Sequence, residues 1–169
     1  MDPFAIGLSI VRDFVTPEEE AEIVSHITKK QETKKGKERN SIQRFGSRKP
    51  YAGNMVSNTI PDYLNAVADK LVAAGLIAKR VDSVSINEYH VGQLITPHID
   101  SRSSGDVITI LSLLGSARMV FSQAKKESVF VDFPPRAVLQ MRDEIRHKWK
   151  HGIEPVTELR YSLVFRQSQ

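Results

Sequence analysis

The part of the sequence that most restricts the possible folds runs from Val81 to Arg166, where short segments of strand character alternate with turn residues. Glycines and prolines separate these segments, and each segment is short enough to form one strand. This pattern favours an antiparallel sandwich, barrel or jelly roll. The expected strands cover 81–89, 107–113, 117–122, 128–133, 137–141, 146–150 and 159–166, with one more around His98.

Two helices are expected before this region. Thr16 and Glu19 flank Pro17 in the pattern of a capping box, in which each side chain bonds the backbone amide of the other residue. A second helix with an apolar stripe begins at Pro61 and stops near Gly75.

A chain of 169 residues is expected to form one domain. We predict a single α+β, mainly β, domain over 1–169. Residues 1–80 would supply a first strand over 8–14, the two helices and a lid, and residues 81–169 would form a jelly-roll core. The two helices are expected to pack on that core.

Composition narrows the function classes. The chain has no cysteine, which excludes thiolate metal sites and cysteine nucleophiles and suits a reducing compartment, the cytoplasm or the nucleus. The N-terminus lacks the basic region of a signal peptide, and no apolar run is long enough to span a membrane. We therefore expect an intracellular monomer with no membrane partner.

The positive charge is concentrated in one segment. Residues 29–39 hold six cations and two acidic residues, an excess equal to the net charge of +4 of the whole chain. Such a run is either a solvated loop or an arm that contacts phosphates.

A metal site is indicated by Pro97-His98-Ile99-Asp100. In an extended strand, His98 and Asp100 would point to the same face while Ile99 packs on the other. One more neutral imidazole would complete a 2-His-1-carboxylate triad, which leaves one face of an octahedral iron(II) open. His147 and His151 would share a strand face, and Gly152, typical of a strand end near a bound group, favours His151.

Polar residues on two other strands indicate a pocket. Asn87 and Tyr89 share a face with serines in the strand 81–89, which is not the pattern of a hydrophobic seam. Arg160 and Arg166 share a face of the last strand, and a dicarboxylate would account for two arginines there.

Two aromatic residues lie among cations after the basic segment. Arg44 and Phe45 precede Gly46, and Tyr51 follows Pro50. The aromatics either cover the core or belong to a lid that stacks on an unpaired base.

Taken together, these motifs resemble the AlkB family of iron(II)- and 2-oxoglutarate-dependent dioxygenases. The resemblance covers the chain from about Val81 to Arg166 and rests on pieces that occur in a fixed order: Asn87-x-Tyr89, His98-x-Asp100, Ser112-Leu113-Leu114-Gly115, His151-Gly152 and Arg160-Tyr161-Ser162-x-x-x-Arg166. It implies a double-stranded β-helix, a relative of the jelly roll.

The resemblance also implies roles for these residues. His98, Asp100 and His151 would hold iron(II). The 2-oxoglutarate and dioxygen would bind beside the metal, with the cosubstrate contacted by five side chains: Asn87, Tyr89, Arg160 at the distal carboxylate, Ser162 and Arg166.

Two positions depart from the family pattern. Ser162 stands where repair enzymes of the family often have asparagine, so one cosubstrate hydrogen bond would come from a shorter side chain or be replaced by water. Arg102 stands where the bacterial repair enzyme has an acidic residue that contacts the base, and arginine cannot accept a hydrogen bond from an exocyclic amino group.

The implied activity is oxidative demethylation or hydroxylation of modified bases in single-stranded DNA or RNA, with Arg44, Phe45, Tyr51 and Arg102 as candidate substrate contacts. The products would be succinate, carbon dioxide and, from N-methyl groups, formaldehyde. Two alternatives are a hydroxylase or demethylase of protein side chains and a non-catalytic nucleic-acid-binding module.

Overall fold

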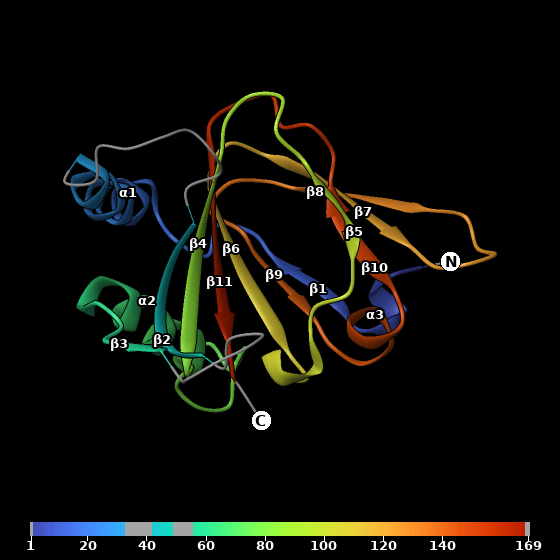
Figure 1. The fold of residues 1–169 in the computed structure, drawn as a ribbon, viewed down its shortest axis with the longest axis horizontal. Helices are drawn as coiled ribbons and strands as arrows, with labels where there is room; N and C mark the ends of the chain where they lie inside the picture. Colours follow the sequence, from blue (N-terminus) through green and yellow to red (C-terminus); the bar gives the residue numbers. More distant parts are fainter. Residues whose placement is uncertain (1, 33–41, 49–55, 168–169) are drawn as a thin grey trace.

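The computed structural model describes residues 2–32, 42–48 and 56–167, and within them two antiparallel sheets face each other (Figure 1). Two short 3-10 helices are also present, η1 (Phe4–Ile6) and η2 (Arg102–Ser104). The larger sheet has the order β1 (Leu8–Val11), β9 (Val138–Met141), β6 (Ile108–Leu114), β11 (Arg160–Arg166), β4 (Ser83–Tyr89), β2 (Ile42–Arg48) and β3 (Val56–Asn58). The smaller sheet has the order β5 (Ile95–His98), β10 (Lys150–Ile153), β7 (Ala117–Ser122) and β8 (Val129–Phe133).

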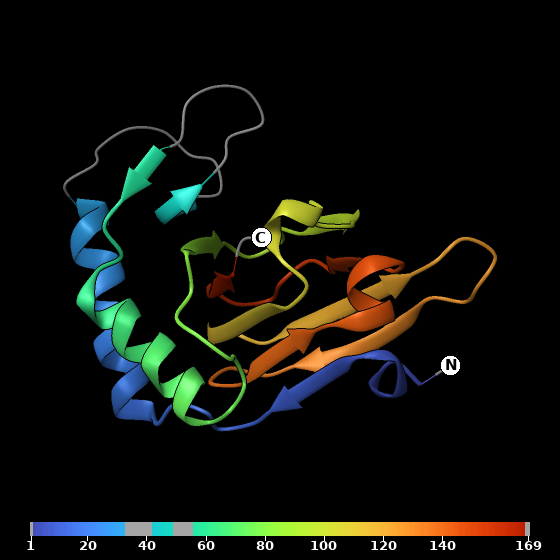
Figure 2. The same ribbon diagram turned by 90° about the horizontal axis from the view of Figure 1, so that it is seen from below.

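The larger sheet separates two hydrophobic cores, because alternate residues of each strand point to opposite faces. On one face, Leu163 of β11 and Ile86 of β4 pack with the helices α1 (Pro17–Glu32) and α2 (Asp62–Ala73). Figure 2 shows both helices on the same side of the sheets. On the other face, side chains of the two sheets meet, and this second core surrounds the candidate site. The fold is the predicted double-stranded β-helix with two N-terminal helices.

Both helices begin where the sequence predicts. The backbone amide of Thr16 donates to Glu19 Oε2 over 2.7 Å, and the amide of Glu19 donates to Thr16 Oγ1 over 3.2 Å, so the capping box is confirmed. The helix α2 begins at Asp62, directly after Pro61, and Gly75 follows that helix with a φ of +68°. No helix among the described residues could cross a membrane.

Several strand bounds differ from the expected ones. The first strand ends at Val11, not at Phe14. Residues 146–150 were expected as a strand, but Asp143–His147 form a short helix, α3, and the next strand begins at Lys150. Acidic residues in the first turn and basic residues in the last turn favour this helix, because their charges interact favourably with the two ends of the helix dipole.

The first eighty residues do more than cover the core. They supply β1 at one edge of the larger sheet and the β2–β3 pair at the other edge. Because β2 pairs directly with β4, the segment that was expected to form only a lid is partly a continuation of the sheet that carries Asn87 and Tyr89.

Candidate active site

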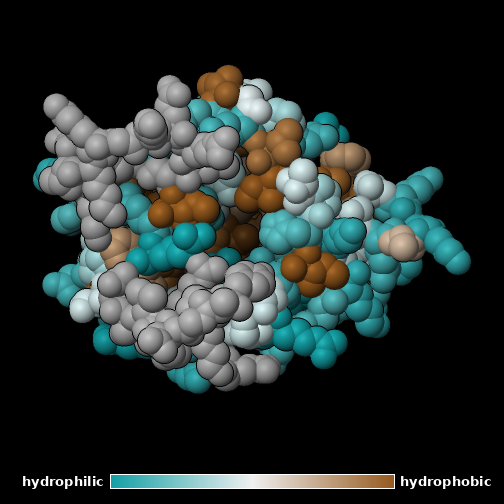
Figure 3. Space-filling model, viewed as in Figure 1, coloured by the Kyte–Doolittle hydropathy of each residue, from teal (hydrophilic) through white to brown (hydrophobic). Residues whose placement is uncertain are grey.

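A pocket opens between the two sheets, and its lining comes from the inner faces of six strands and the segment after β5. The space-filling view shows a hollow near the middle of this side, bordered in part by hydrophobic surface (Figure 3). Polar and charged lining residues are Asn87, Tyr89, His98, Asp100, His151, Arg160, Ser162 and Arg166, and the apolar ones include Ile108, Ile110, Met119, Ile153 and Val164.

The central strand β11 explains why so many of these residues meet. Residues directly opposite each other in antiparallel strands point to the same face. Ser162 lies opposite Asn87 of β4 and Ser112 of β6, while Arg160 lies opposite Tyr89. One face of three neighbouring strands is therefore polar at this level.

His98, Asp100 and His151 lie together at the pocket, with their ligand atoms within 4.8 Å of one another. His98 lies directly opposite His151 across the β5–β10 pair, and their ring centroids are 4.6 Å apart. His98 Nε2 is 3.3 Å from Asp100 Oδ1, and His98 Nδ1 is 3.0 Å from the carbonyl oxygen of Thr96. When Nδ1 donates to that carbonyl and Nε2 has lost its proton, Nε2 and the carboxylate both present lone pairs, an arrangement that fits a shared cation.

The electrostatics of the three residues also suit a metal. Burial lowers the pKa of His151 to about 4, so its imidazole is neutral at physiological pH, as a metal ligand must be. Burial alone would raise the pKa of Asp100, but its hydrogen bond with His98 and the charge of Arg166 outweigh burial and lower it well below the usual range. The same hydrogen bond to Asp100 raises the pKa of His98, so a bound cation would take the place of the proton that these two side chains share. His151 and Asp100 already offer a neutral imidazole and an ionised carboxylate.

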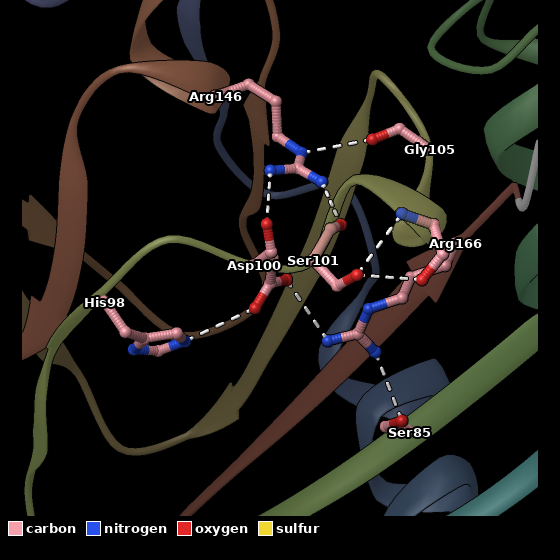
Figure 4. Close-up of polar contacts among 8 residues, drawn as sticks. Ser85, His98, Asp100, Ser101, Gly105, Arg146 and Arg166 are labelled. Carbon is pink, nitrogen blue, oxygen red and sulfur yellow. Dashed lines mark hydrogen bonds and ion pairs between the residues drawn. The ribbon is translucent and has the colours of Figure 1, made fainter. Parts of the chain in front are cut away.

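Arg166 holds the outer oxygen of this carboxylate. Its Nη2 lies 3.4 Å from Asp100 Oδ2, and its Nη1 donates to Ser85 Oγ over 3.1 Å (Figure 4). All seven residues of β11 pair with both β4 and β6, so Arg166 extends from a firmly held strand and orients the Asp100 carboxylate.

Arg160 lies at the closed end of the pocket and is completely buried. Its Nε donates to Ser112 Oγ over 2.9 Å, and its Cζ lies 5.4 Å from the ring centroids of both Tyr89 and Phe133. Both Nη atoms are buried and have no hydrogen-bond partner among the described residues. Burial lowers the pKa of Arg160 to about 10, which leaves it charged at neutral pH. A buried guanidinium with unpartnered N–H donors favours the binding of an anion.

Tyr89 lies beside this arginine and is also buried. Burial raises the pKa of its hydroxyl, so the phenol stays protonated and can donate a hydrogen bond. Asn87 and Ser162 are paired across β4 and β11 and line the same pocket. The five residues expected to contact the cosubstrate are therefore gathered in one place.

Two steps of the sequence argument about the triad were wrong, although the three residues do meet. The strand β5 ends at His98, so Asp100 lies in the segment after it and not on a shared strand face. Gly152 lies inside β10, where a Cβ would come within 2.5 Å of the carbonyl oxygen of Ile95, so glycine is needed there for the close approach of β5. The alternative ligand His147 is the last residue of α3 and is exposed, and its Nε2 lies 3.5 Å from Asp106 Oδ1.

The expected substrate contacts are more scattered. Phe45 is 5% exposed and packs in the helix-side core, so the stacking role predicted for it was wrong and the alternative core role is observed. Arg44 lies opposite Ser85, which places it on the pocket face of β2. Arg102 is exposed in η2. Tyr51 lies outside the described residues, as does most of the basic segment 29–39.

Sequence reasoning missed Arg146. It reads as one cation in the run Arg146-His147-Lys148, yet it is 1% exposed and donates to three backbone carbonyls near Asp100. The only signal in the sequence is the pair of apolar residues near it, Ile145 and Trp149, which are both buried.

The comparison with known families agrees with this geometry. The model of the 2OG-Fe(II) oxygenase superfamily matches residues 37–166. A tRNA (carboxymethyluridine(34)-5-O)-methyltransferase, alkbh8, of Xenopus tropicalis is 35% identical over 88% of this chain. The chain belongs to the AlkB family of 2OG-Fe(II) oxygenases.

The relatives are longer than this chain, to different extents. The chain spans 25% of the Xenopus protein, and it spans 73% of the uncharacterized protein L905 of Acanthamoeba polyphaga mimivirus, to which it is 30% identical over 88% of its own length. Among solved structures, OsALKBH1 has a TM-score of 0.71 at 16% identity, covering 99% of both chains. A Pseudomonas putida prolyl-4-hydroxylase has a TM-score of 0.62 at 14% identity, covering 99% of this chain and 96% of that one. At these identities the structures support the fold alone.

This AlkB-family protein therefore uses iron(II), 2-oxoglutarate and dioxygen. The residues present fit these groups. The imidazoles of His98 and His151 and the carboxylate of Asp100 lie together at the pocket. The buried guanidinium of Arg160 also lines it, and its two Nη atoms have no partner among the described residues.

Proposed function

We propose that this protein is a dioxygenase that oxidises a modified base in single-stranded nucleic acid. His98, Asp100 and His151 would hold the iron, and Arg160 would bind the distal carboxylate of 2-oxoglutarate. Asn87, Tyr89 and Ser162 would complete the cosubstrate contacts, and Arg166 would orient Asp100.

The observation that carries this proposal is the pair of unpartnered Nη atoms of Arg160. A guanidinium offers its donors in a planar fork that matches a carboxylate. Here Ser112 Oγ takes Nε, and the rings of Tyr89 and Phe133 flank the guanidinium, so its orientation is fixed before a ligand arrives. A dicarboxylate with one end at Arg160 would reach toward the His98–Asp100–His151 cluster with the other.

With iron(II) and 2-oxoglutarate bound, one atom of dioxygen oxidises 2-oxoglutarate to succinate and carbon dioxide, and the other becomes a hydroxyl group on the substrate. The protein contributes binding and exclusion of water. The apolar residues Ile108, Ile110, Met119 and Val164 keep the pocket wall dry, and His151 and Asp100 keep the protonation states that metal binding needs. An N-methyl group hydroxylated in this way would leave the nitrogen as formaldehyde, with a hydrogen atom in its place on the nitrogen, whereas a C-linked group would retain the hydroxyl.

A modified uridine of tRNA is the first substrate class to examine. Arg102, two residues after Asp100, carries only hydrogen-bond donors, and uracil presents carbonyl acceptors where adenine and cytosine present an amino group. The name of the Xenopus relative also specifies carboxymethyluridine 34 of tRNA. The methyl transfer in that name belongs to a protein of which this chain spans only 25%.

The test is a substrate screen at saturating iron(II) and 2-oxoglutarate. Anticodon stem-loops with carboxymethyluridine or its methyl ester, N-methylated DNA and RNA oligonucleotides, and peptides are compared by product mass and formaldehyde release. We expect one added oxygen atom on a uridine stem-loop or formaldehyde from an N-methyl base. Turnover of peptides alone would favour the protein-hydroxylase alternative, and no succinate under any condition would favour a non-catalytic module.

The basic segment gives a second, independent test of a nucleic-acid substrate, although its residues from 33 on lie outside the described part of the chain. If it contacts phosphates, affinity should fall linearly with the logarithm of salt concentration. Replacing Lys34, Lys35 and Lys37 with alanine should then flatten the slope by up to roughly 2 to 3 units, at about 0.7 to 0.9 per contact.

The matching control is a free modified nucleoside. Its turnover should be the same in the triple variant and the wild type, because phosphate contacts position a strand without reading its bases. Identical salt slopes for the two proteins on one oligonucleotide would show that the segment is a solvated loop.

A further inference from the structure

Arg146 is a buried arginine whose charge is not paired with a carboxylate by any ion pair in the described part of the chain. Instead its guanidinium donates to three backbone carbonyls: Nε to Gly105 over 3.1 Å, Nη1 to Asp100 over 3.1 Å and Nη2 to Ser101 over 2.8 Å. Figure 4 shows the guanidinium pointing into the segment that these carbonyls belong to. A rigid fork with three occupied directions fixes that segment in one position.

The segment needs such support, because the sheet does not provide it. The strand β5 ends at His98, so the ladder with β10 stops two residues before Asp100. Beyond it the chain makes a single 3-10 turn, η2, and then reaches Gly105. A backbone without ladder partners is free to shift, and a shift here would move the Asp100 carboxylate away from His98.

Other contacts hold the same segment at different points. Arg166 Nη2 lies 3.4 Å from the Asp100 carboxylate, while Arg146 binds the Asp100 carbonyl, so this residue is held at both its side chain and its backbone. Gly105 has a φ of +89°, and a Cβ there would come within 2.0 Å of the carbonyl oxygen of Gln167. The segment is therefore fitted closely between α3 and the end of β11.

Arg146 also connects this segment to the third member of the triad. It lies in α3, and α3 leads through Trp149 directly into β10, which carries His151. Trp149 is 1% exposed, which anchors this stretch of chain in the core. A shift of the Asp100 segment relative to His151 would have to break the three hydrogen bonds of one side chain.

We propose that Arg146 is a positioning residue that sets the distance between Asp100 and His151 and thereby the metal affinity of the site. This inference rests on the proposed ligand set. Arg146 touches neither metal nor substrate; it acts through the backbone of residues 100–105.

The experiment measures metal affinity directly, by titrating the purified apoprotein with cobalt(II) or manganese(II). The variants are Arg146→Lys and Arg146→Gln, with Lys148→Gln as a matched control, since Lys148 lies next to α3 and is exposed. Loss of an outer partner of a metal ligand typically costs about 10- to 100-fold in affinity. We expect a loss in that range for Arg146→Gln, a smaller loss for Arg146→Lys, and wild-type affinity for Lys148→Gln.

At saturating metal, both Arg146 variants should approach the wild-type rate of 2-oxoglutarate turnover, because the ligands themselves remain. Unchanged metal affinity in folded Arg146→Gln and Arg146→Lys would overturn the proposal. So would an Arg146→Lys chain that stays unfolded at saturating metal, since Arg146 would then hold the fold and not the site.

A His151→Ala variant in the same titration separates this inference from the proposed function. If His151→Ala loses metal binding while both Arg146 variants keep it, only the positioning role fails. If His151→Ala binds metal as the wild type does, the ligand set itself is wrong.

Discussion

Replacing His98, Asp100 or His151 with alanine is expected to abolish 2-oxoglutarate turnover, whereas His147→Ala should keep most of it. The three residues present their ligand atoms within 4.8 Å of one another, and His147 is exposed at the end of α3. Loss of a side chain that only hydrogen-bonds a metal ligand already costs about 10- to 100-fold in metal affinity or activity. Loss of a ligand itself should therefore reduce turnover by more than about 100-fold. Succinate formation at saturating iron(II) measures this.

Cobalt(II) titration of the same variants shows whether the loss is at the metal. The exposed pair of His147 with Asp106 contributes about 0 to 1 kcal/mol, so His147→Ala should fold and bind metal normally. If His147→Ala removed metal binding and His151→Ala retained it, the ligand assignment would be reversed.

Arg160→Met is expected to have two effects of opposite sign. Truncating one partner of a buried charged pair costs about 2 to 5 kcal/mol, so the 2-oxoglutarate concentration for half-maximal turnover should rise by about 30-fold or more. Without 2-oxoglutarate the variant should be at least as stable as the wild type, because methionine removes a completely buried cation whose Nη atoms lack partners among the described residues.

Thermal unfolding with and without 2-oxoglutarate measures both effects. The cosubstrate should raise the unfolding temperature of the wild type and have little effect on Arg160→Met. Arg118→Met is a suitable control, since Arg118 is exposed on β7 and pairs with Glu154. An unchanged 2-oxoglutarate titration for Arg160→Met would exclude Arg160 from the cosubstrate site.

The features predicted correctly depend on neighbours in sequence or on strict alternation. The capping box joins Thr16 to Glu19, and the polar face of β4 follows from every second residue up to Tyr89. Both patterns are local, so the sequence contains all the information that they need.

The features predicted wrongly depend on contacts between distant segments. Whether Phe45 stacks on a base or fills the core is decided by α1 and α2, which pack on the same face of the sheet. Arg146 bonds carbonyls more than forty residues before it, and backbone carbonyls leave no trace in residue types. The short helix α3 was missed because five residues give too few repeats for a period to be recognised.

The place of β11 in the larger sheet has a consequence for how the protein is made. This strand lies between β6 and β4, yet every other strand of the sheet precedes it in the chain. Until the ribosome has released residues 160–166, the sheet consists of two separate parts, β1-β9-β6 and β4-β2-β3. Pairings between strands so far apart in sequence form slowly, and the unpaired edges favour aggregation meanwhile. Because β11 also brings Arg160 and Arg166, a nascent chain acquires its sheet and its cosubstrate pocket in the same step.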